Sequence, residues 1–469
     1  MIALAVSAPF AGALVAAALY RLPSRRLIRG LLAAIAVALA VAALPAIDPL
    51  SAIFVAIVSI LSFLATLYSL SIFPTTEHEQ TRWSSRPAYF VLLGAFWSSM
   101  LVCVTSTTFS GVWIGISATT LATTFLVGFS GGKAALEAAW KYLMLCSFGI
   151  AIALIGILLL GRAGMSAHIA PAAALSWDAL GAHGARLPPD LTRVALALML
   201  LGFGTKAGLV PMHAWLPDAH SKAPAPISAL LSGLLVSCAL YAIVRVQHVA
   251  AVTAPGFFNA VLLCIGSLSV LVAAVLMLAQ RDVKRLLSYS TVEHAGLIAI
   301  ALGLGTPLGA LAGLYHIVNH AFTKGLAFLA VGIVQHERGT TTIGKLHGLW
   351  HAPSGKFFLV ALIGLMGLPP FGIFISELLI VVAAALVHAW AALACALTGI
   401  LIAFIAIVRL AIDTESGGPR LSAAPARRSP VPAFFAVSGS AAGALLLSLA
   451  PFSSFASKTL ALLAAPEAR

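Results

Sequence analysis

Three ionisable side chains in the segment YHIVNHAFTKGLAF follow one another at intervals of four residues. On an α-helix, His316, His320 and Lys324 would lie on one face, with about 6 Å between neighbours. Histidine titrates near neutral pH and has two ring nitrogens, so a file of histidines that ends at a lysine can pass protons through intervening water. A single histidine is more often a buried structural residue, but three aligned groups predict a proton relay.

Two further ionisable residues, Lys206 and Glu377, each stand beside glycines and prolines within an apolar run. The runs read LLGFGTKAGLVPMHAWLP from Leu200 and LIGLMGLPPFGIFISELL from Leu362. Glycine and proline interrupt the backbone hydrogen bonds of a helix, which is tolerable inside a membrane only where protein or water satisfies the freed groups. A buried lysine or carboxylate can exchange a proton reversibly, so both residues are predicted carriers. The structural alternatives are that Lys206 binds carbonyls freed by the break and that Glu377 caps a helix end.

The segment SYSTVEHAG places Glu293 and His294 just after the basic stretch RDVKR. Adjacent helix positions point about 100° apart, so only one of the two needs to face a polar interior, and His294 is the predicted carrier. In LEAAWKYL, Glu137 and Lys141 have the spacing and order that favour an ion pair within a helix. A structural role at the membrane interface and a catalytic role both remain open for that pair.

The composition indicates that lipid surrounds the elements that hold these residues. The mean hydropathy is +1.06, and 61% of the residues are hydrophobic whereas only 9% are charged, against about a quarter in soluble proteins. Apolar runs of about twenty residues, each able to cross a hydrocarbon core of about 30 Å, recur along the chain. The sequence therefore predicts one all-α polytopic membrane domain over residues 1–469. Its expected transmembrane helices, about fourteen, start near residues 2, 27, 50, 87, 111, 134, 192, 225, 256, 283, 308, 355, 390 and 431.

The basic residues of the expected loops indicate how the chain is oriented. If the N-terminus faces outward, most of the 27 lysines and arginines fall in loops on the cytoplasmic side, as the positive-inside rule requires. Both termini are then expected on the periplasmic side of a bacterial inner membrane. This bias also accounts for the net charge of +13 without a nucleic-acid partner.

Neither a metal nor a cofactor is expected in this chain. The 5 cysteines stand singly, with no C-x-x-C pair for zinc or an iron–sulfur cluster. The stretch PMHAWLPDAHSKAPAP contains His213, Asp218 and His220, but its prolines predict a rigid hairpin in place of a metal site. Any redox chemistry is therefore expected in other subunits.

The two interrupted spans, the seventh and the twelfth, lie in corresponding places in two halves of the chain. Such pairs are typical of inverted-repeat transporters, whose working site lies at the breaks. Two ordinary kinked helices are the alternative. The predicted repeats of five helices cover residues 87–247 and 256–411, and residues 1–86 and 431–469 are predicted to form flanking helices.

Three separated motifs resemble the proton-translocating antiporter-like family shared by complex I, multisubunit cation/proton antiporters and membrane-bound hydrogenases. They are HAWLPDAHSKAPAPISALLSG from His213, RDVKRLLSYSTVEHAG from Arg281 and HIVNHAFTKGLAFLAVG from His316, and the resemblance covers about residues 85–410. The phrases WIGISATTLATTFLVGF, LEAAWKYL and SYSTVEHAG are most similar to component F of hydrogenase-4-like and formate-hydrogenlyase-like complexes. Glu377, where L-type members of complex I have lysine, points to the M-like branch.

The resemblance implies roles for the residues named above. Lys206 would be the central lysine of a first half-channel, and Glu377 would be the terminal proton carrier. The link and the second half would consist of His316, His320 and Lys324. The implied partners are other membrane subunits and peripheral iron–sulfur, hydrogenase-like or dehydrogenase-like subunits, in which quinone or ferredoxin chemistry drives the charge shifts. The chain itself would be a non-catalytic membrane subunit of the oxidoreductase.

Two positions depart from the family pattern. The fifth span of the family carries a glutamate that pairs with the central lysine, and the matching residue here is Ser117, which cannot ionise. The eighth span has Ser237 where some members have lysine. Glu137 could substitute for the missing glutamate but lies further along the chain, across a loop. Three functions stay open: a redox-coupled proton or sodium pump module, a subunit of a secondary cation/proton antiporter, and a structural membrane-arm subunit with impaired pumping.

Overall fold

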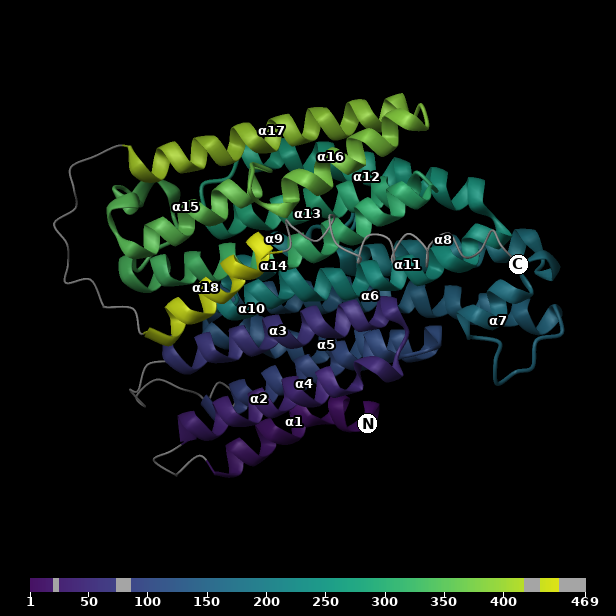
Figure 1. Ribbon diagram of the computed structural model, residues 1–469, viewed down its shortest axis with the longest axis horizontal. Helices are drawn as coiled ribbons and strands as arrows, with labels where there is room; N and C mark the ends of the chain where they lie inside the picture. The colour runs from purple at the N-terminus through teal and green to yellow at the C-terminus, as the bar shows by residue number, and fades with distance from the viewer. Residues whose placement is uncertain (20–24, 73–85, 417–430, 447–469) are drawn as a thin grey trace.

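The computed structural model describes residues 1–19, 25–72, 86–416 and 431–446. Its helices run side by side along one direction, and the short helix α7 lies at one end of the bundle (Figure 1). Within these residues, ten helices are long and apolar enough to cross a membrane, and shorter apolar helices accompany them. The helices are α1 (Ile2–Ala18), α2 (Arg25–Ala43), α3 (Pro49–Ile72), α4 (Arg86–Thr105), α5 (Phe109–Val127), α6 (Gly132–Ser166), α7 (Trp177–Ala182), α8 (Pro189–Ala207), α9 (Trp215–Lys222), α10 (Ala225–Leu230), α11 (Val236–Thr253), α12 (Pro255–Leu278), α13 (Val283–Gly303), α14 (Pro307–Arg338), α15 (Pro353–Leu365), α16 (Gly372–Leu386), α17 (Trp390–Glu415) and α18 (Val431–Leu446).

The predicted class of an all-α polytopic membrane protein is confirmed. Each of the fourteen predicted spans corresponds to one described helix or to a pair of successive helices that begins within a few residues of the expected start. The predicted loop residues Arg21 and Arg82, and the part of the C-terminal flank beyond residue 446, lie outside the described residues. The orientation inferred from the basic loops stays a prediction.

Both breaks predicted from glycine and proline are confirmed. Helix α8 ends at Ala207, Gly208 takes a left-handed φ of 76°, and α9 starts at Trp215. Helix α15 ends at Leu365, and α16 starts at Gly372. Each broken pair is the fourth membrane-spanning element of a predicted repeat, which agrees with the inverted-repeat hypothesis. The repeats themselves stay a prediction.

Side chains satisfy backbone groups that the first break frees. The amide of Val210 donates to Ser269 Oγ at 2.9 Å, and Trp215 Nε1 donates to the carbonyl of Thr205 at 2.8 Å. Such bonds are needed because an unpaired backbone group in a hydrocarbon environment is strongly destabilising. The break is therefore an integral part of the fold, and it ends α8 directly after Lys206.

A π-helical turn, Leu231–Leu235, joins α10 to α11. Such turns are rare and occur frequently at functional sites. Every residue of this turn is buried, and the Ser237 hydroxyl donates to the carbonyl of Gly233 at 2.7 Å. The uncharged residue of the eighth span is therefore hydrogen-bonded within its own helix.

The helices form an inner group and an outer wall. The most apolar stretches of α14 and of the segment Ala225–Thr253 are 100% buried in the protein, and that of α13 is 94% buried. The corresponding stretches of α6 and α12 are only 39% buried, and that of α17 is 33% buried. Helix α14 packs against α10, α13, α15, α16 and α18. The predicted proton carriers on α13 and α14 therefore lie inside the protein and not against lipid.

An ion pair ties the N-terminal flank to the first predicted repeat. Arg245 of α11 donates to Asp48, just before α3, at 2.6 Å, and Ser51 Oγ lies 2.9 Å from the hydroxyl of Tyr241. Burial opposes ionisation of Asp48, but the hydrogen bond from Ser51 and the charge of Arg245 outweigh it and lower the pKa of this carboxyl. The paired charges therefore hold α3 against α11.

Two local predictions were wrong. Lys284, expected in a basic loop, lies in the first turn of α13 and is 1% exposed. The proline-rich stretch from Pro211, expected to be a rigid hairpin, contains the helix α9 and then turns into α10. Proline is tolerated in the first turn of a helix because the N–H that it lacks has no partner there, and Pro217 and Pro226 occupy such positions.

Candidate functional site

Two buried histidines on neighbouring helices contact each other at the centre of the inner group. Nδ1 of His294 on α13 lies 3.0 Å from Nε2 of His316 on α14. The other ring nitrogen of His316 lies 2.8 Å from Ser376 Oγ, which belongs to the first turns of α16 after the second break. One line of hydrogen-bonding groups therefore joins three helices.

The second histidine of the predicted file also faces α13. The ring centroid of His320 lies 5.4 Å from that of His294. His320 is fully buried, and neither of its ring nitrogens has a hydrogen-bonding partner among the described residues. The two α14 histidines thus lie on one buried face, as their spacing predicts, and His294 of α13 stands opposite both.

Lys324 continues this face one turn further along α14. Its ammonium group donates to the hydroxyl of Ser290 and, at 3.2 Å, to the carbonyl of Leu287, both on α13. Glu293 lies close enough to interact electrostatically with Lys324. The lysine is fully buried, so its charge depends on these groups for stabilisation.

Glu293 is a buried neighbour of His294 that the sequence pattern wrongly excluded as a carrier. It is 2% exposed, and its Oε2 lies 3.7 Å from Nε2 of the neighbouring His294. The expectation that only one of two adjacent residues faces a polar interior holds for a helix with one exposed side. Helix α13 has protein on nearly all sides, so both residues face other helices.

Lys206 has a neutral partner on α6. It lies in the last turn of α8, is fully buried, and donates to the hydroxyl of Tyr142 at 2.6 Å. Its ammonium nitrogen also lies 4.7 Å from the centre of the Tyr142 ring, a distance at which a cation is attracted to an aromatic face. The Tyr142 hydroxyl in turn lies 2.6 Å from Thr123 Oγ1 on α5. A chain of hydroxyl groups therefore leads from Lys206 to α5.

Ser117 does not belong to that chain. It is half-buried, and its hydroxyl donates to the carbonyl of Trp113 in its own helix at 2.7 Å. The α5 side chain that bonds to Tyr142 is Thr123, nearly two turns further along. The structure thus places no carboxylate of α5 beside Lys206, in agreement with the departure noted in the sequence.

Glu377 lies beside the glycine of the second break. Gly367 has a φ of 63°, and a Cβ atom at this position would collide with the Glu377 carboxylate. Glycine is therefore needed here both for the backbone conformation and for space. Glu377 is half-buried and interacts electrostatically with Glu293, which places it at the α16 end of the group of ionisable side chains.

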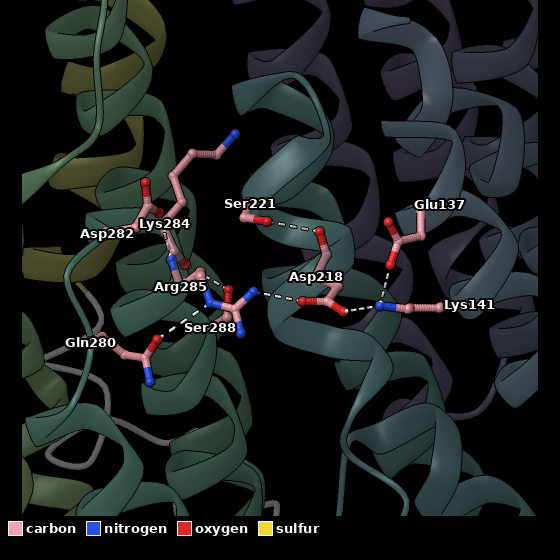
Figure 2. A network of polar contacts seen from close by, with 9 residues as sticks. All are labelled: Glu137, Lys141, Asp218, Ser221, Gln280, Asp282, Lys284, Arg285 and Ser288. Carbon is pink, nitrogen blue, oxygen red and sulfur yellow. Dashed lines mark hydrogen bonds and ion pairs between the residues drawn. The ribbon is translucent and has the colours of Figure 1, made fainter. Parts of the chain in front are cut away.

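A second polar network lies near the start of α6 and α13 (Figure 2). Lys141 lies 2.6 Å from Glu137 and 3.4 Å from Asp218 of α9, and Asp218 also binds Arg285 of α13 at 2.6 Å. Gln280 accepts from Arg285 at 3.3 Å. The network therefore links α6 to α13 through α9. Glu137 is engaged with Lys141 at the surface, where 64% of its side chain is exposed, and the structural and catalytic roles of this pair both stay hypotheses.

Lys141→Ala is expected to reduce ion transport by no more than about twofold, because an exposed ion pair contributes only about 0–1 kcal/mol. Asp218 would keep its shorter contact with Arg285 in this variant. Ion transport into vesicles, with the yield of assembled complex as the control, measures the effect. A complete block in a fully assembled complex would instead assign Lys141 to the ion pathway.

The three residues considered for a metal site do not converge. Asp218 binds Lys141 and Arg285, whereas the ring of His220 stacks on Phe328 with 5.0 Å between centroids. No group of three His, Cys, Asp or Glu residues within the described part of the chain is arranged to hold a metal ion.

Two buried basic residues were not selected as carriers from the sequence. Lys284 donates to the carbonyl of Ala223 at 2.6 Å, and His220 is fully buried with no hydrogen-bonding partner for its ring nitrogens among the described residues. Both lie in motifs quoted above, but their burial depends on the packing of α9, α10 and α13. They lie between the surface network and Lys324, with which His220 interacts electrostatically.

Buried ionisable side chains at two helix breaks and on two enclosed helices define an antiporter-like, ion-translocating class of membrane subunit. The chain belongs to the NADH:quinone oxidoreductase/Mrp antiporter transmembrane family, whose sequence pattern matches residues 106–403.

Relatives of known name support this assignment. The chain is 35% identical over 393 residues to the hydrogenase-4 component F homolog of Methylacidiphilum infernorum, a match that covers 83% of this chain and 82% of that protein. It is 31% identical over 348 residues to hydrogenase-4 component B of Escherichia coli, which covers 70% of this chain and 49% of that protein.

Solved structures share the fold. A chain of the archaeal membrane-bound sulfane sulfur reductase superposes with a TM-score of 0.82 at 23% identity, covering 98% of this chain and 96% of that chain. A chain of respiratory complex I from Thermus thermophilus superposes with a TM-score of 0.76 at 25% identity, covering 96% of this chain and 98% of that chain. The arrangement of helices is therefore that of the membrane subunits of multisubunit complexes.

Proposed function

We propose that this chain is the proton-translocating membrane subunit of a redox-driven complex of the hydrogenase-4 or complex I type. The observation that carries the proposal is the line of buried groups across α13, α14 and α16, in which His316 lies within hydrogen-bonding distance of both His294 and Ser376. Such groups are destabilising inside a membrane protein unless they serve a function. The similarity to a hydrogenase-4 component F homolog favours a redox-driven complex.

In this proposal Lys206 is the central carrier of the first half of the pathway. Its bond to Tyr142 holds the ammonium group at the break without a neighbouring carboxylate, so protonation and deprotonation of Lys206 would depend on the charge state of the second half. Among the described residues, no direct hydrogen bond joins Lys206 to the histidines. We infer that water molecules connect the two halves.

The second half of the pathway extends from Lys324 to Glu377. Lys324 exchanges its proton with Glu293 or with water, and the histidines receive it because their ring nitrogens can both donate and accept. The short contact between His294 and His316 allows transfer by rotation of the proton between tautomers. Glu377, at the second break, passes the proton onward.

We propose that the remaining components of the reaction reside in other subunits. Peripheral iron–sulfur and hydrogenase-like or dehydrogenase-like subunits would supply the electrons, and this chain would hold no cofactor. We also propose a bacterial inner membrane location with both termini on the periplasmic side. In this orientation the network of Lys141, Asp218 and Arg285 faces the cytoplasm.

The proposal is tested by extracting the tagged chain in mild detergent and identifying copurifying proteins by mass spectrometry. A nickel–iron hydrogenase-like large subunit with iron–sulfur proteins is the expected result. Copurification with small antiporter subunits only would favour a secondary cation/proton antiporter, to which the similarity to an Na(+)/H(+) antiporter protein of Alkalihalophilus pseudofirmus, at 28% identity, also points. Ion exchange by that assembly in vesicles without an electron donor would then replace the redox-driven function.

Ser117→Glu is expected to raise redox-driven proton transport severalfold if the first half of the pathway is functional but weakly coupled. The substitution introduces a carboxylate on α5, one turn from Thr120, and α5 packs against the helix that bears Tyr142. A nearby negative charge would stabilise the ammonium form of Lys206. The measurement is the number of protons transported per electron in reconstituted vesicles.

Ser117→Gln is the matched control for that substitution, because glutamine has the same size as glutamate without its charge. Equal transport in the Glu, Gln and parent proteins would contradict the coupling argument and favour a structural membrane-arm subunit.

A further inference from the structure

A groove opens toward the outside of the bundle between α1, α2, α3 and α4, apart from the predicted proton carriers. Its volume, including the mouth, is about 410 Å³. Apolar side chains beside it point outward, with Leu14 47% and Leu31 60% exposed, as expected for helices that face lipid. Small residues leave the space between the helices unfilled: Gly12, Ala13, Ala16 and Ala33.

One wall of this apolar groove holds an arginine. Arg29 is the fifth residue of α2, about 6 Å from its start at a rise of 1.5 Å per residue. The side chain is only 4% exposed, and its guanidinium lies 4.3 Å from the centre of the Phe90 ring on α4. A guanidinium held on an aromatic face keeps a rigid fork of donors, which matches the geometry of a phosphate.

Trp97 supplies a second polar group deeper in the same groove. It lies seven residues after Phe90 on α4, about 10 Å further along the helix axis. The indole is 3% exposed, and its Nε1 has no hydrogen-bonding partner among the described residues. A buried indole N–H usually has an acceptor, so the groove favours a ligand that has a polar acceptor below its charged end.

We propose that this groove binds one anionic phospholipid. The order of groups along the groove matches the order in a glycerophospholipid: a phosphate at Arg29, ester carbonyls that accept from Trp97 Nε1, and an acyl chain against the alanines of α1 and α2. The exposed Arg26 adds positive charge near the mouth. Basic pockets between transmembrane helices are recognised sites for such head groups. The proposed orientation assigns the lipid to the cytoplasmic leaflet, whereas the site itself does not depend on ion transport.

Native mass spectrometry of the intact complex, delipidated and titrated with phosphatidylglycerol, tests the proposal. One tightly bound phosphatidylglycerol is expected, and zwitterionic phosphatidylcholine is expected to bind more weakly. Arg29→Gln should weaken phosphatidylglycerol binding about tenfold, because it removes a hydrogen bond to a charged group. Arg26→Gln makes the same change of charge at an exposed position on the same helix and should change the affinity by less than about twofold.

A second variant separates loss of the lipid from loss of the fold. Ala33→Leu narrows the groove without changing its charge, and it should displace the lipid while redox-driven transport by the assembled complex continues. Equal affinity for the two lipids, retention of phosphatidylglycerol in both Arg29→Gln and Ala33→Leu, or a neutral quinone bound in place of the phospholipid would each overturn the proposal. None of these outcomes would bear on the proposed proton pathway.

Discussion

Redox-driven proton transport is expected to fall by about a hundredfold or more when Lys324 is replaced by alanine, because the substitution removes a proton carrier from an enclosed pathway. The ammonium group contacts Ser290 and the Leu287 carbonyl on α13, so nothing else on α14 occupies its place. The complex should still assemble, since the methylene chain of one lysine contributes little to the packing of a 32-residue helix. Proton uptake per electron in reconstituted vesicles is the measurement.

Lys324→Arg distinguishes a carrier from a fixed charge. Arginine keeps the positive charge but does not release its proton inside proteins. The arginine variant should therefore assemble and transport as poorly as the alanine variant. Transport close to that of the parent protein in Lys324→Arg would show that only the charge is needed and would remove Lys324 from the pathway.

The second large effect is expected at Lys206. Lys206→Ala should also reduce proton transport by about a hundredfold, because the residue is the ionisable group at the break that ends α8. Tyr142→Phe removes the hydroxyl that accepts from Lys206 and should reduce transport by about tenfold, since a hydrogen bond to a charged group contributes about 1.5–3 kcal/mol. Both variants are assayed in the same vesicles as the Lys324 variants.

Thr124→Val is a suitable control for the Lys206 variants. Thr124 also lies on α5, but its hydroxyl donates to its own helix, at the carbonyl of Thr120. The control should transport protons at the rate of the parent protein. Normal transport in both Lys206→Ala and Tyr142→Phe would contradict the proposed first half of the pathway.

The membrane helices and their breaks could be predicted because they depend on local sequence. Apolar runs of sufficient length form helices in lipid, and the glycines and prolines around Gly208 and Gly367 end them. The shared face of His316, His320 and Lys324 follows from helix geometry alone. These features need no knowledge of which helices are neighbours.

The partners of these residues could not be predicted because they come from distant parts of the chain. Tyr142 and Lys206 are 64 positions apart, and no sequence pattern marks a tyrosine as the partner of a lysine. Glu293 and Lys284 were missed for a related reason. An isolated helix has an exposed side, whereas the surroundings of α13 are set by the helices that enclose it, and these follow from the tertiary structure.

The division into an inner group and an outer wall has an electrical consequence. Helices α6, α12 and α17 face outward, whereas α13 and α14 are enclosed. A charge on the inner helices is thus separated from hydrocarbon by a layer of peptide dipoles and polar side chains, which are more polarisable than lipid tails. The outer helices act as an insulating sheath, so the electrostatic barrier that a moving ion experiences is set by the protein and is largely independent of the composition of the surrounding bilayer.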